Sequence, residues 1–229
     1  MDLWRIGIVG NSNWKQYFDQ KAETHGASVK SSDYFDDTSF FVQRDNILNW
    51  LGELKDKQIL DAGCGVGAFS EPWVRDNTVY GVDFSEKSLE FAADRGLKTL
   101  NGDLGALPFE SGTFDVVVCI GVIQLIEDYE PIINELARVT RPGGTLLIQT
   151  LHKGSLQRKM LGLFERSKKF DRMYEMDDLA RVFVRAGFTS VEFLKQYHPF
   201  QVVTKSNMTG TLADSFCTSF AIRGSKKSG

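Results

Sequence analysis

The sequence is poor in the residues that cross-link chains or bind metals, with three cysteines and three histidines among 229 residues. The cysteines, Cys64, Cys119 and Cys217, are odd in number and far apart. Disulfide frameworks and structural zinc sites need paired or closely spaced cysteines. We therefore expect no disulfide, no metal site and a reducing compartment.

An excess of charge of one sign and a long hydrophobic run are also absent. The 27 Lys and Arg residues nearly balance the 30 Asp and Glu residues, for a formal net charge of -3. This balance argues against nucleic acid or an anionic membrane as a partner. The longest apolar run, residues 116–126, is too short to span a bilayer, and the first residues show no signal-peptide pattern. We expect a cytoplasmic protein without stable membrane insertion, whose oligomeric state the sequence leaves open.

From residue 58 onward, short apolar runs alternate with helical periods, which indicates a parallel sheet with crossover helices. One helix is expected to begin after Ser85, a favourable N-cap, and to end before Gly96. A second is expected from Glu130 to Val139, stopping at the motif RPGG. The first five strands are expected at residues 58–61, 78–83, 98–103, 114–120 and 145–150.

The remaining chain completes an α/β fold class. An amphipathic helix ending before Gly187 is followed by a sixth strand near residues 191–194. A last strand, about 216–223, follows a polar stretch, so we expect the two strands to form an antiparallel hairpin at the sheet edge. The sequence thus predicts a Rossmann-like, seven-stranded, mostly parallel sheet with helices on both faces and an antiparallel C-terminal strand.

The segment DAGCGVGA, residues 61–68, raises a choice between cofactors. Gly63, Gly65 and Ala68 fit the G-x-G-x-x-G/A spacing of dinucleotide-binding loops, whose glycines let the backbone approach a ligand. Asp61, however, ends an otherwise apolar strand, where a dinucleotide loop has no charge to satisfy. A carboxylate at that position suits a ligand with a cationic or amine end.

Five motifs in order resemble the class I S-adenosylmethionine-dependent methyltransferases, of the small-molecule, UbiE/UbiG-like type. They are DAGCGVG at 61–67, GVDFS at 81–85, GDL at 102–104, FDVVV at 114–118 and RPGG at 141–144. The resemblance implies an enzyme that moves a methyl group from S-adenosylmethionine to a small-molecule acceptor by in-line displacement, leaving S-adenosylhomocysteine. Under this reading residues 1–54 form a helical cap or lid. Residues 55–229 form the methyltransferase domain, with an insertion at about 153–176 in the substrate site.

The resemblance also implies how the methionyl end of the cofactor is held. Gly63, Gly65 and Gly67 are expected to let the backbone approach it, with Asp61 binding its amine directly or through water. Arg44 is a candidate partner for the methionyl carboxylate. Tyr17, like Tyr34, is a further candidate for cofactor contact from the aromatic N-terminal segment, although these aromatic residues could equally form a helical cap on the sheet.

The adenosine end is expected to contact residues after the second, third and fourth strands. Asp83 offers two acceptors to the ribose hydroxyls, and Phe84 offers a face to the adenine. Asp103 and the Leu104 N–H are expected to bind the adenine, and Ile120 to lie along the cofactor. Asp83 could instead cap the following helix, and Asp103 could be a turn residue.

The acceptor side is less defined by the sequence. His152 directly follows the fifth strand and is the first candidate for a general base; a solvated or hydrogen-bonded loop histidine is the alternative. Gln124 follows the fourth strand and could orient the acceptor or simply start a helix. The segment 155–170 combines apolar residues with many cations, so it could admit an amphipathic or acidic acceptor, touch a membrane surface, or be a solvated amphipathic helix. We expect a small-molecule acceptor, lipophilic or natural-product-like, and the lack of a basic surplus in the whole chain argues against nucleic acid.

Two other functions stay open at this point. A nicotinamide-dependent oxidoreductase would use Gly63, Gly65, Ala68 and Asp83, but Asp61 and the GDL motif count against it. A catalytically silent, methyltransferase-like binding subunit would keep the fold and lose cofactor contacts.

Overall fold

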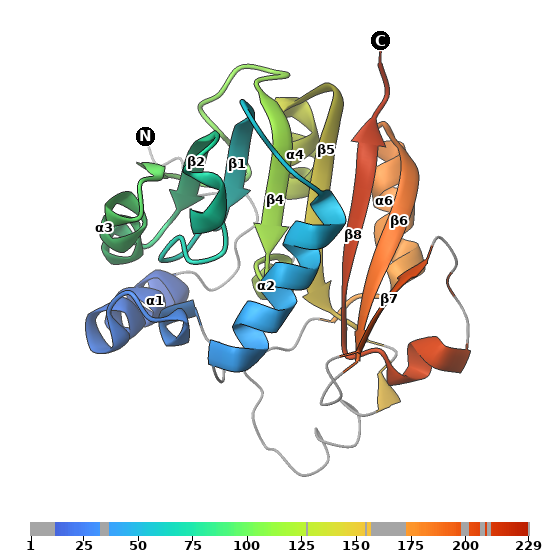
Figure 1. Ribbon diagram of the computed structural model, residues 1–229, viewed down its shortest axis with the longest axis horizontal. Helices are drawn as coiled ribbons and strands as arrows, with labels where there is room; N and C mark the ends of the chain where they lie inside the picture. The colour runs from blue at the N-terminus through green and yellow to red at the C-terminus, as the bar shows by residue number, and fades with distance from the viewer. Residues whose placement is uncertain are drawn as a thin grey trace.

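The computed structural model in Figure 1 describes residues 12–32, 37–126, 128–153, 155–156, 173–197, 202–206, 209 and 212–228. Its strands are β1 (Gln58–Ala62), β2 (Thr78–Asp83), β3 (Lys98–Asn101), β4 (Phe114–Ile120), β5 (Thr140–Leu151), β6 (Phe188–Tyr197), β7 (Val202–Ser206) and β8 (Ser219–Lys226). Within these residues they form one sheet of eight strands in the order β3-β2-β1-β4-β5-β8-β6-β7. Strands β1 to β6 share one direction, while β7 and β8 run against their neighbours.

Helices cover both faces of this sheet (Figure 1). They are α1 (Ser12–His25), α2 (Asp37–Leu51), α3 (Glu86–Asp94), α4 (Glu130–Val139) and α6 (Met176–Arg185). Ile47 of α2 and Leu89 of α3 belong to the apolar cluster on one face. Ile133 of α4 and Leu179 of α6 belong to the cluster on the other face. The sheet is therefore the middle layer of three.

The central strand β4 explains why this arrangement forms. Val116 and Val118 lie in the cluster under α2, whereas Val117 and Cys119 lie in the cluster under α4. A continuous apolar run of this kind is stable only when both faces of the strand are covered, as in parallel sheets with crossover helices.

The two clearest helix predictions are confirmed. Helix α3 begins after Ser85, whose Oγ accepts the Ser88 N–H at 3.1 Å, and Gly96 follows its end with a φ of 92°. Helix α4 runs from Glu130 to Val139 as predicted. The Ser85 cap and Gly96 mark the ends of α3 because capping involves residues close in sequence, whereas α4 has no side-chain cap and is marked by its helical spacing of apolar residues.

The α/β class, the mostly parallel sheet and the helices on both faces are confirmed, but the number of strands and the edge hairpin differ from the prediction. Residues 202–206, which overlap the expected polar connection, form β7 and pair with β6 at the edge. Strand β8 does pair antiparallel with β6, but it lies inside the sheet between β5 and β6. Its residues Phe220, Ala221 and Ile222 are completely buried and need cover on both faces, whereas the exposed Thr204 and Lys205 of β7 suit an edge.

The predicted N-terminal cap is helical in its described part, where α1, a short 3-10 helix (Val29–Ser32) and α2 lie. Its role as a lid stays a prediction. The predicted insertion at about 153–176 falls mostly outside the described residues. None of the helices in the described part of the chain has the length and apolarity needed to cross a bilayer.

Replacing Phe220 by Ala is expected to lower the free energy of unfolding by about 3–5 kcal/mol, because it removes a buried ring from the middle of the sheet. This ring makes edge contacts with His152 and Phe193, at centroid distances of 5.8 and 6.0 Å. Phe216→Ala is the control, since Phe216 is 57% exposed, and should change stability by less than about 0.5 kcal/mol. Equal losses in urea titrations of the two variants would contradict the internal position of β8.

Candidate active site

Parallel strands bring most of the predicted site residues to one edge of the sheet. The carboxyl ends of β1, β2, β4 and β5 meet there, carrying Asp61, Asp83 and Ile120. Asp103 and Leu104 follow β3 at the same edge. Ligands of open α/β sheets bind outside this edge, so the arrangement is that of a candidate ligand site.

The glycine loop after β1 adopts a conformation that requires glycine. Gly63, Gly65 and Gly67 have φ angles of 80°, 51° and 77°, in the left-handed region. A Cβ on Gly63 would lie 2.3 Å from the Val122 side chain, and one on Gly67 would lie 3.0 Å from Ala92. The loop is thus packed directly against the segment after β4 and against α3, which fixes the path of its backbone.

The Asp61 carboxyl is buried beside this loop and lacks a cationic partner among the described residues. Its Oδ2 accepts a hydrogen bond from Ser70 Oγ at 2.6 Å. Burial raises the pKa of Asp61 to about 7; the Ser70 hydrogen bond opposes this rise and the charge of Asp83 adds to it. An ammonium group at this position would favour the ionised form.

Asp83 connects the glycine loop to the start of α3. Its Oδ2 accepts the Gly65 N–H at 2.8 Å, and its Oδ1 accepts the Ser85 N–H at 2.9 Å. Burial raises the pKa of Asp83, and these backbone hydrogen bonds oppose that effect. The contact with Ser85 shows the helix-start role considered from the sequence. A carboxylate oxygen can accept more than one hydrogen bond, so both oxygens keep acceptor capacity for a ribose.

Helix α1 packs against the residues that follow β2. Asp19 Oδ1 accepts a hydrogen bond from Ser85 Oγ at 2.6 Å. The ring of Phe18 meets that of Phe84 edge-on at 5.9 Å, and Tyr17 contacts Phe18 at 5.2 Å. Tyr17 therefore lies in an aromatic cluster that reaches the predicted adenine residue Phe84 through Phe18.

Arg44 extends from α2 to the glycine loop. Its guanidinium donates to the Ala68 carbonyl at 3.4 Å and to Asp45 at 3.0 Å, and it lies over the Phe41 ring at 4.7 Å. The structure thus brings Arg44 next to the loop expected to hold the methionyl end. Tyr34 lies outside the described residues.

The loop after β3 carries Asp103 and Leu104. Asp103 Oδ1 accepts the Gly105 N–H at 2.8 Å, which is a turn contact, and its Oδ2 has no hydrogen bond within the described part of the chain. The Leu104 side chain is buried in the apolar cluster under α4. One carboxylate oxygen of Asp103 thus shapes the turn, and the other remains available to a ligand.

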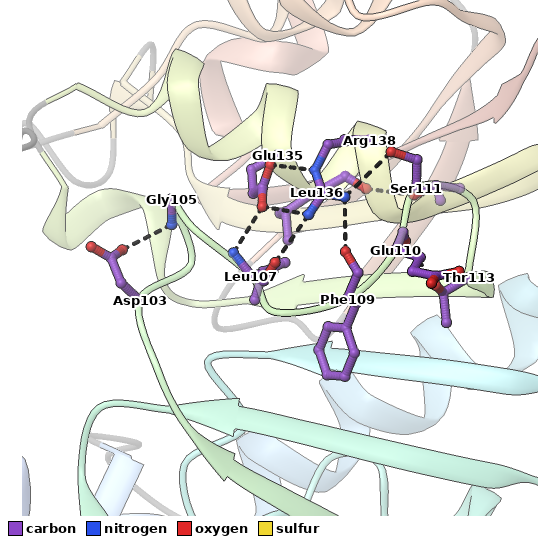
Figure 2. Close-up of polar contacts among 11 residues, drawn as sticks. Asp103, Gly105, Leu107, Phe109, Glu110, Ser111, Thr113, Glu135, Leu136 and Arg138 are labelled. Carbon is purple, nitrogen blue, oxygen red and sulfur yellow. Dashed lines mark hydrogen bonds and ion pairs between the residues drawn. The ribbon is translucent and has the colours of Figure 1, made fainter.

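Two charged residues of α4 hold the same loop in place (Figure 2). Glu135 Oε1 accepts the Leu107 N–H at 2.8 Å. Arg138 donates to the carbonyls of Leu107 and Phe109 at 3.0 and 2.8 Å, and it pairs with Glu135 at 2.7 Å. The loop after β3 is therefore anchored to α4 by contacts with its backbone that a change of loop conformation would break.

His152 is buried after β5, with one ring nitrogen held by a backbone carbonyl and the other near a carboxylate. Its Nδ1 lies 3.1 Å from the Cys217 carbonyl, which can only accept, so Nδ1 carries the hydrogen. Its Nε2 lies 3.6 Å from the carboxylate of Glu175. Gln124, in a 3-10 helix (Ile123–Leu125), is also buried, and its Oε1 accepts from Thr150 Oγ1 at 3.2 Å. Both residues predicted for the acceptor side are thus ordered at the carboxyl edge.

Of the other two histidines, His25 ends α1 and is exposed, and His198 lies outside the described residues. The three cysteines are buried free thiols, and burial raises the pKa of Cys64 well above its usual range, as expected of a packed side chain. The described residues contain no group of three or more His, Cys, Asp or Glu side chains that could hold a metal ion.

Sequence reasoning missed Asp19, Ser70, Glu175 and Gln149. Ser70 and Glu175 contact predicted site residues across 9 and 23 positions, and Asp19 contacts Ser85 across 66. No local pattern marks such partners. Gln149 did carry a signal, because a glutamine near the end of an otherwise apolar strand matches the reasoning applied to Asp61.

The chain matches the family model described as Methyltransferase domain over residues 60–148. It is 31% identical over 178 residues to the demethylmenaquinone methyltransferase of Lactococcus lactis subsp. lactis. The aligned region covers 63% of this chain and 71% of that protein. The chain belongs to the class I S-adenosylmethionine-dependent methyltransferases. The resemblance seen in the five motifs is therefore confirmed.

This methyltransferase chain also has relatives that act on other acceptors. It is 40% identical over 103 residues to the malonyl-[acyl-carrier protein] O-methyltransferase of Erwinia pyrifoliae, covering 44% of this chain and 39% of that protein. The chain thus spans less than half the length of that relative.

A solved SAM-dependent methyltransferase from Thermotoga maritima shares the fold, with a TM-score of 0.70 and 21% identity. The superposition covers 93% of this chain and 99% of that chain.

The affinity for S-adenosylhomocysteine is expected to fall by up to about tenfold per pH unit below pH 7, because the ligand's ammonium group must displace a proton from Asp61. Asp61→Asn should bind more weakly and lose this pH dependence. The ligand-free protein should lose stability as the pH rises from the ordinary aspartate value of 3.8 towards about 7 and should level off above that pH, since over this range folded Asp61 holds a proton that the unfolded chain has released. Titration calorimetry and thermal unfolding between pH 5.5 and 8 measure both effects; a pH dependence unchanged in Asp61→Asn would contradict the assignment.

Proposed function

We propose that this chain transfers the methyl group of S-adenosylmethionine to a small-molecule acceptor. The observation that carries the proposal is the buried Asp61 carboxyl beside the glycine loop, with no cation paired to it in the described residues and a pKa raised to about 7. The ammonium group of the methionyl end supplies the missing charge. A dinucleotide would bring a pyrophosphate towards this carboxyl, and the comparisons favour neither a nicotinamide-dependent oxidoreductase nor a silent subunit.

The remaining cofactor contacts follow the same edge of the sheet. Arg44 beside Ala68 binds the methionyl carboxylate, and Asp83 accepts from the ribose hydroxyls. Asp103 uses its free oxygen for the adenine amino group, and Phe84 with Phe18 covers the ring from the α1 side. Helices α1 and α2 thereby act as the lid over the cofactor.

The chain's contribution to catalysis is mainly to bring the two reactants into line in a site from which water is excluded. Such positioning can supply much of the rate enhancement of a bimolecular displacement, and no covalent intermediate with the protein is needed. Where the acceptor must lose a proton, His152 is the proposed base. Its Nδ1–H is held by the Cys217 carbonyl, so the lone pair of the neutral ring is on Nε2, on the side of Glu175.

The acceptor is proposed to be small and lipophilic. Three exposed large apolar side chains are close to residues of the site: Phe41, Leu156 and Phe216. The ring of Phe41 lies against Arg44. Phe216 precedes Cys217, and Leu156 follows Ser155, whose N–H donates to the His152 carbonyl. Apolar surface of this kind often marks a binding region. The net charge of -3 supports a small molecule over nucleic acid, and the three free thiols support a cytoplasmic location.

Titration calorimetry should show micromolar binding of S-adenosylmethionine and S-adenosylhomocysteine and no binding of NADH or NADPH. Asp83→Ala is expected to abolish the binding of both adenosyl ligands, because Asp83 holds the glycine loop and faces the ribose. Asp76→Ala is the control, since Asp76 is an exposed carboxylate before the opposite end of β2 that pairs with Arg75. Unchanged affinity in Asp83→Ala would remove Asp83 from the site, and binding of a nicotinamide cofactor alone would overturn the proposed function.

His152→Gln is expected to lower kcat by about 10²-fold or more with an acceptor that loses a proton, and to leave the affinity for S-adenosylmethionine unchanged. Without this base the rate should depend on the ionisation of the acceptor itself, so the rise of kcat in the pH–rate profile should move to higher pH. His25→Gln, at the exposed end of α1, is the control and should keep full activity. Full turnover by His152→Gln would show that another group, or none, takes the proton.

A further inference from the structure

Two glutamine side chains from β5 and the 3-10 helix after β4 converge on Gly121. A methyl group built on Gly121 would lie 3.5 Å from Nε2 of Gln124 and 4.0 Å from Oε1 of Gln149, with no other contact within 4 Å beyond its chain neighbours. Gln149 pairs with Ile120 in the parallel register of β4 and β5, at the predicted cofactor edge. The amide nitrogen of Gln124 and the amide oxygen of Gln149 thus both face the space beside Gly121, where a methyl group would make ordinary van der Waals contacts, at the predicted cofactor edge.

These amides are buried without the hydrogen bonds that buried amides normally make. Gln149 is 4% exposed, and its side chain has no hydrogen-bond partner among the described residues. Gln124 is 9% exposed; its Oε1 accepts from Thr150, and its Nε2 has no acceptor in the same part of the chain. Most buried polar side chains in folded proteins are paired, so an amide with no partner beside one that is only half-paired needs an explanation.

A third glutamine at the same edge shows the contrast. Gln196 of β6 is 5% exposed, and its Oε1 accepts from Ser219 Oγ at 2.8 Å and from Gln43 Nε2 at 3.3 Å. Gln196 thereby joins β6 to β8 and to α2. The Nε2 of Gln196, like that of Gln124, has no acceptor among the described residues, so the contrast lies in the side-chain oxygen: those of Gln196 and Gln124 accept hydrogen bonds, whereas that of Gln149 accepts none in this part of the chain.

We propose that Gln124 and Gln149 bind the nucleophilic oxygen of the methyl acceptor, which makes this chain an O-methyltransferase for a hydroxyl or carboxylate group. This inference rests on the proposed function. Gln124 Nε2 donates to one lone pair of the oxygen, and a second lone pair attacks the methyl group. A hydroxyl also donates to Oε1 of Gln149, while a carboxylate receives the N–H of Gln124 and, once the Gln149 amide has turned to present its Nε2, an N–H of Gln149 as well.

The number of lone pairs selects oxygen over nitrogen. A neutral amine has one lone pair, which must point at the methyl group, so the Gln124 donor would stay unpaired. A thiol is a weak donor and acceptor and would satisfy neither amide. A site with buried polar groups rejects ligands that leave those groups unpaired.

The transfer is balanced without a further reactant. An oxygen lone pair forms the new O–C bond while the C–S bond breaks, and its electron pair stays on sulfur as the sulfonium becomes a neutral thioether. A carboxylate arrives without a proton, whereas a hydroxyl gives up its proton to a base or to solvent. The amides hold the oxygen in position and take no proton themselves.

The first test compares Gln149→Met with Gln196→Met, two near-isosteric changes of buried amides at the same edge. Gln149→Met should keep or raise the Tm and bind S-adenosylhomocysteine as tightly as the wild type, since no hydrogen bond is lost. Gln196→Met should lower the Tm, since two hydrogen bonds are lost. A Tm loss in Gln149→Met equal to that in Gln196→Met would show a structural role and overturn the proposal.

The second test uses four matched probes: 1-hexanol, hexanoate, hexylamine and hexanethiol. Ligand-detected NMR on the full chain saturated with S-adenosylhomocysteine should show binding of at least one oxygen probe, and at least tenfold weaker binding of that probe to Gln149→Met and Gln124→Met. The alcohol and the acid arms tell a hydroxyl acceptor from a carboxylate. Stronger binding of the amine or thiol, an unchanged affinity in both variants, or no binding of either oxygen probe at millimolar concentration would overturn the proposal and leave ordered water as the partner of the pair.

The two proposals fail in different ways. Loss of the proposed function would appear as no binding of S-adenosylhomocysteine to the wild-type chain in the calorimetry described above. Failure of the oxygen-binding pair would appear as normal S-adenosylhomocysteine binding together with no selective effect of Gln149→Met or Gln124→Met on the oxygen probes.

Discussion

The site depends on the carboxylate of Asp83 and on what it joins. It accepts one N–H from the glycine loop and one from the start of α3, and Ser85 continues the connection to Asp19 of α1. Three segments that are far apart in sequence are thereby held at the end of β2. Burial disfavours the ionised form of this carboxylate and raises its pKa, and the hydrogen bonds from the two backbone N–H groups oppose that rise. A ribose bound there would donate further hydrogen bonds to a carboxylate that already holds the glycine loop and the start of α3 in place.

That the residues predicted for the cofactor would lie together at one edge of the sheet was largely predictable from the sequence, for a physical reason. Asp61 and Asp83 lie near the ends of the buried strands β1 and β2, and Asp103 follows β3, so the parallel sheet brings the three together at the carboxyl ends of its strands. The ends of α3 were predictable because caps involve near neighbours in the chain, and α4 was predictable from the helical spacing of its apolar residues. The partners Ser70 and Glu175 were not, since their contacts arise only when distant segments pack together.

The position of β8 shows a different limit. Hairpin reasoning assumed that a strand pairs only with the one before it, and it correctly gave the β6–β8 pairing. It could not place β8 beside β5. That pairing arises because β8 is apolar on both faces and is stable only inside the sheet, where both faces are covered. The apolar run from Phe220 to Ile222 carried this information, but its meaning depended on knowing that a more polar strand was available for the edge.

The interior position of β8 also has a consequence for how the protein is made. Strands β6 and β7 reach the rest of the sheet only through β8, which follows both of them in the chain. During synthesis, the segment through β5 can assemble early, while β6 and β7 must wait with an unpaired strand edge until residues 219–226 have emerged from the ribosome. Such late, non-local pairing slows folding and exposes a strand edge to other chains. Nascent chains at this stage are therefore the ones that most need protection by chaperones.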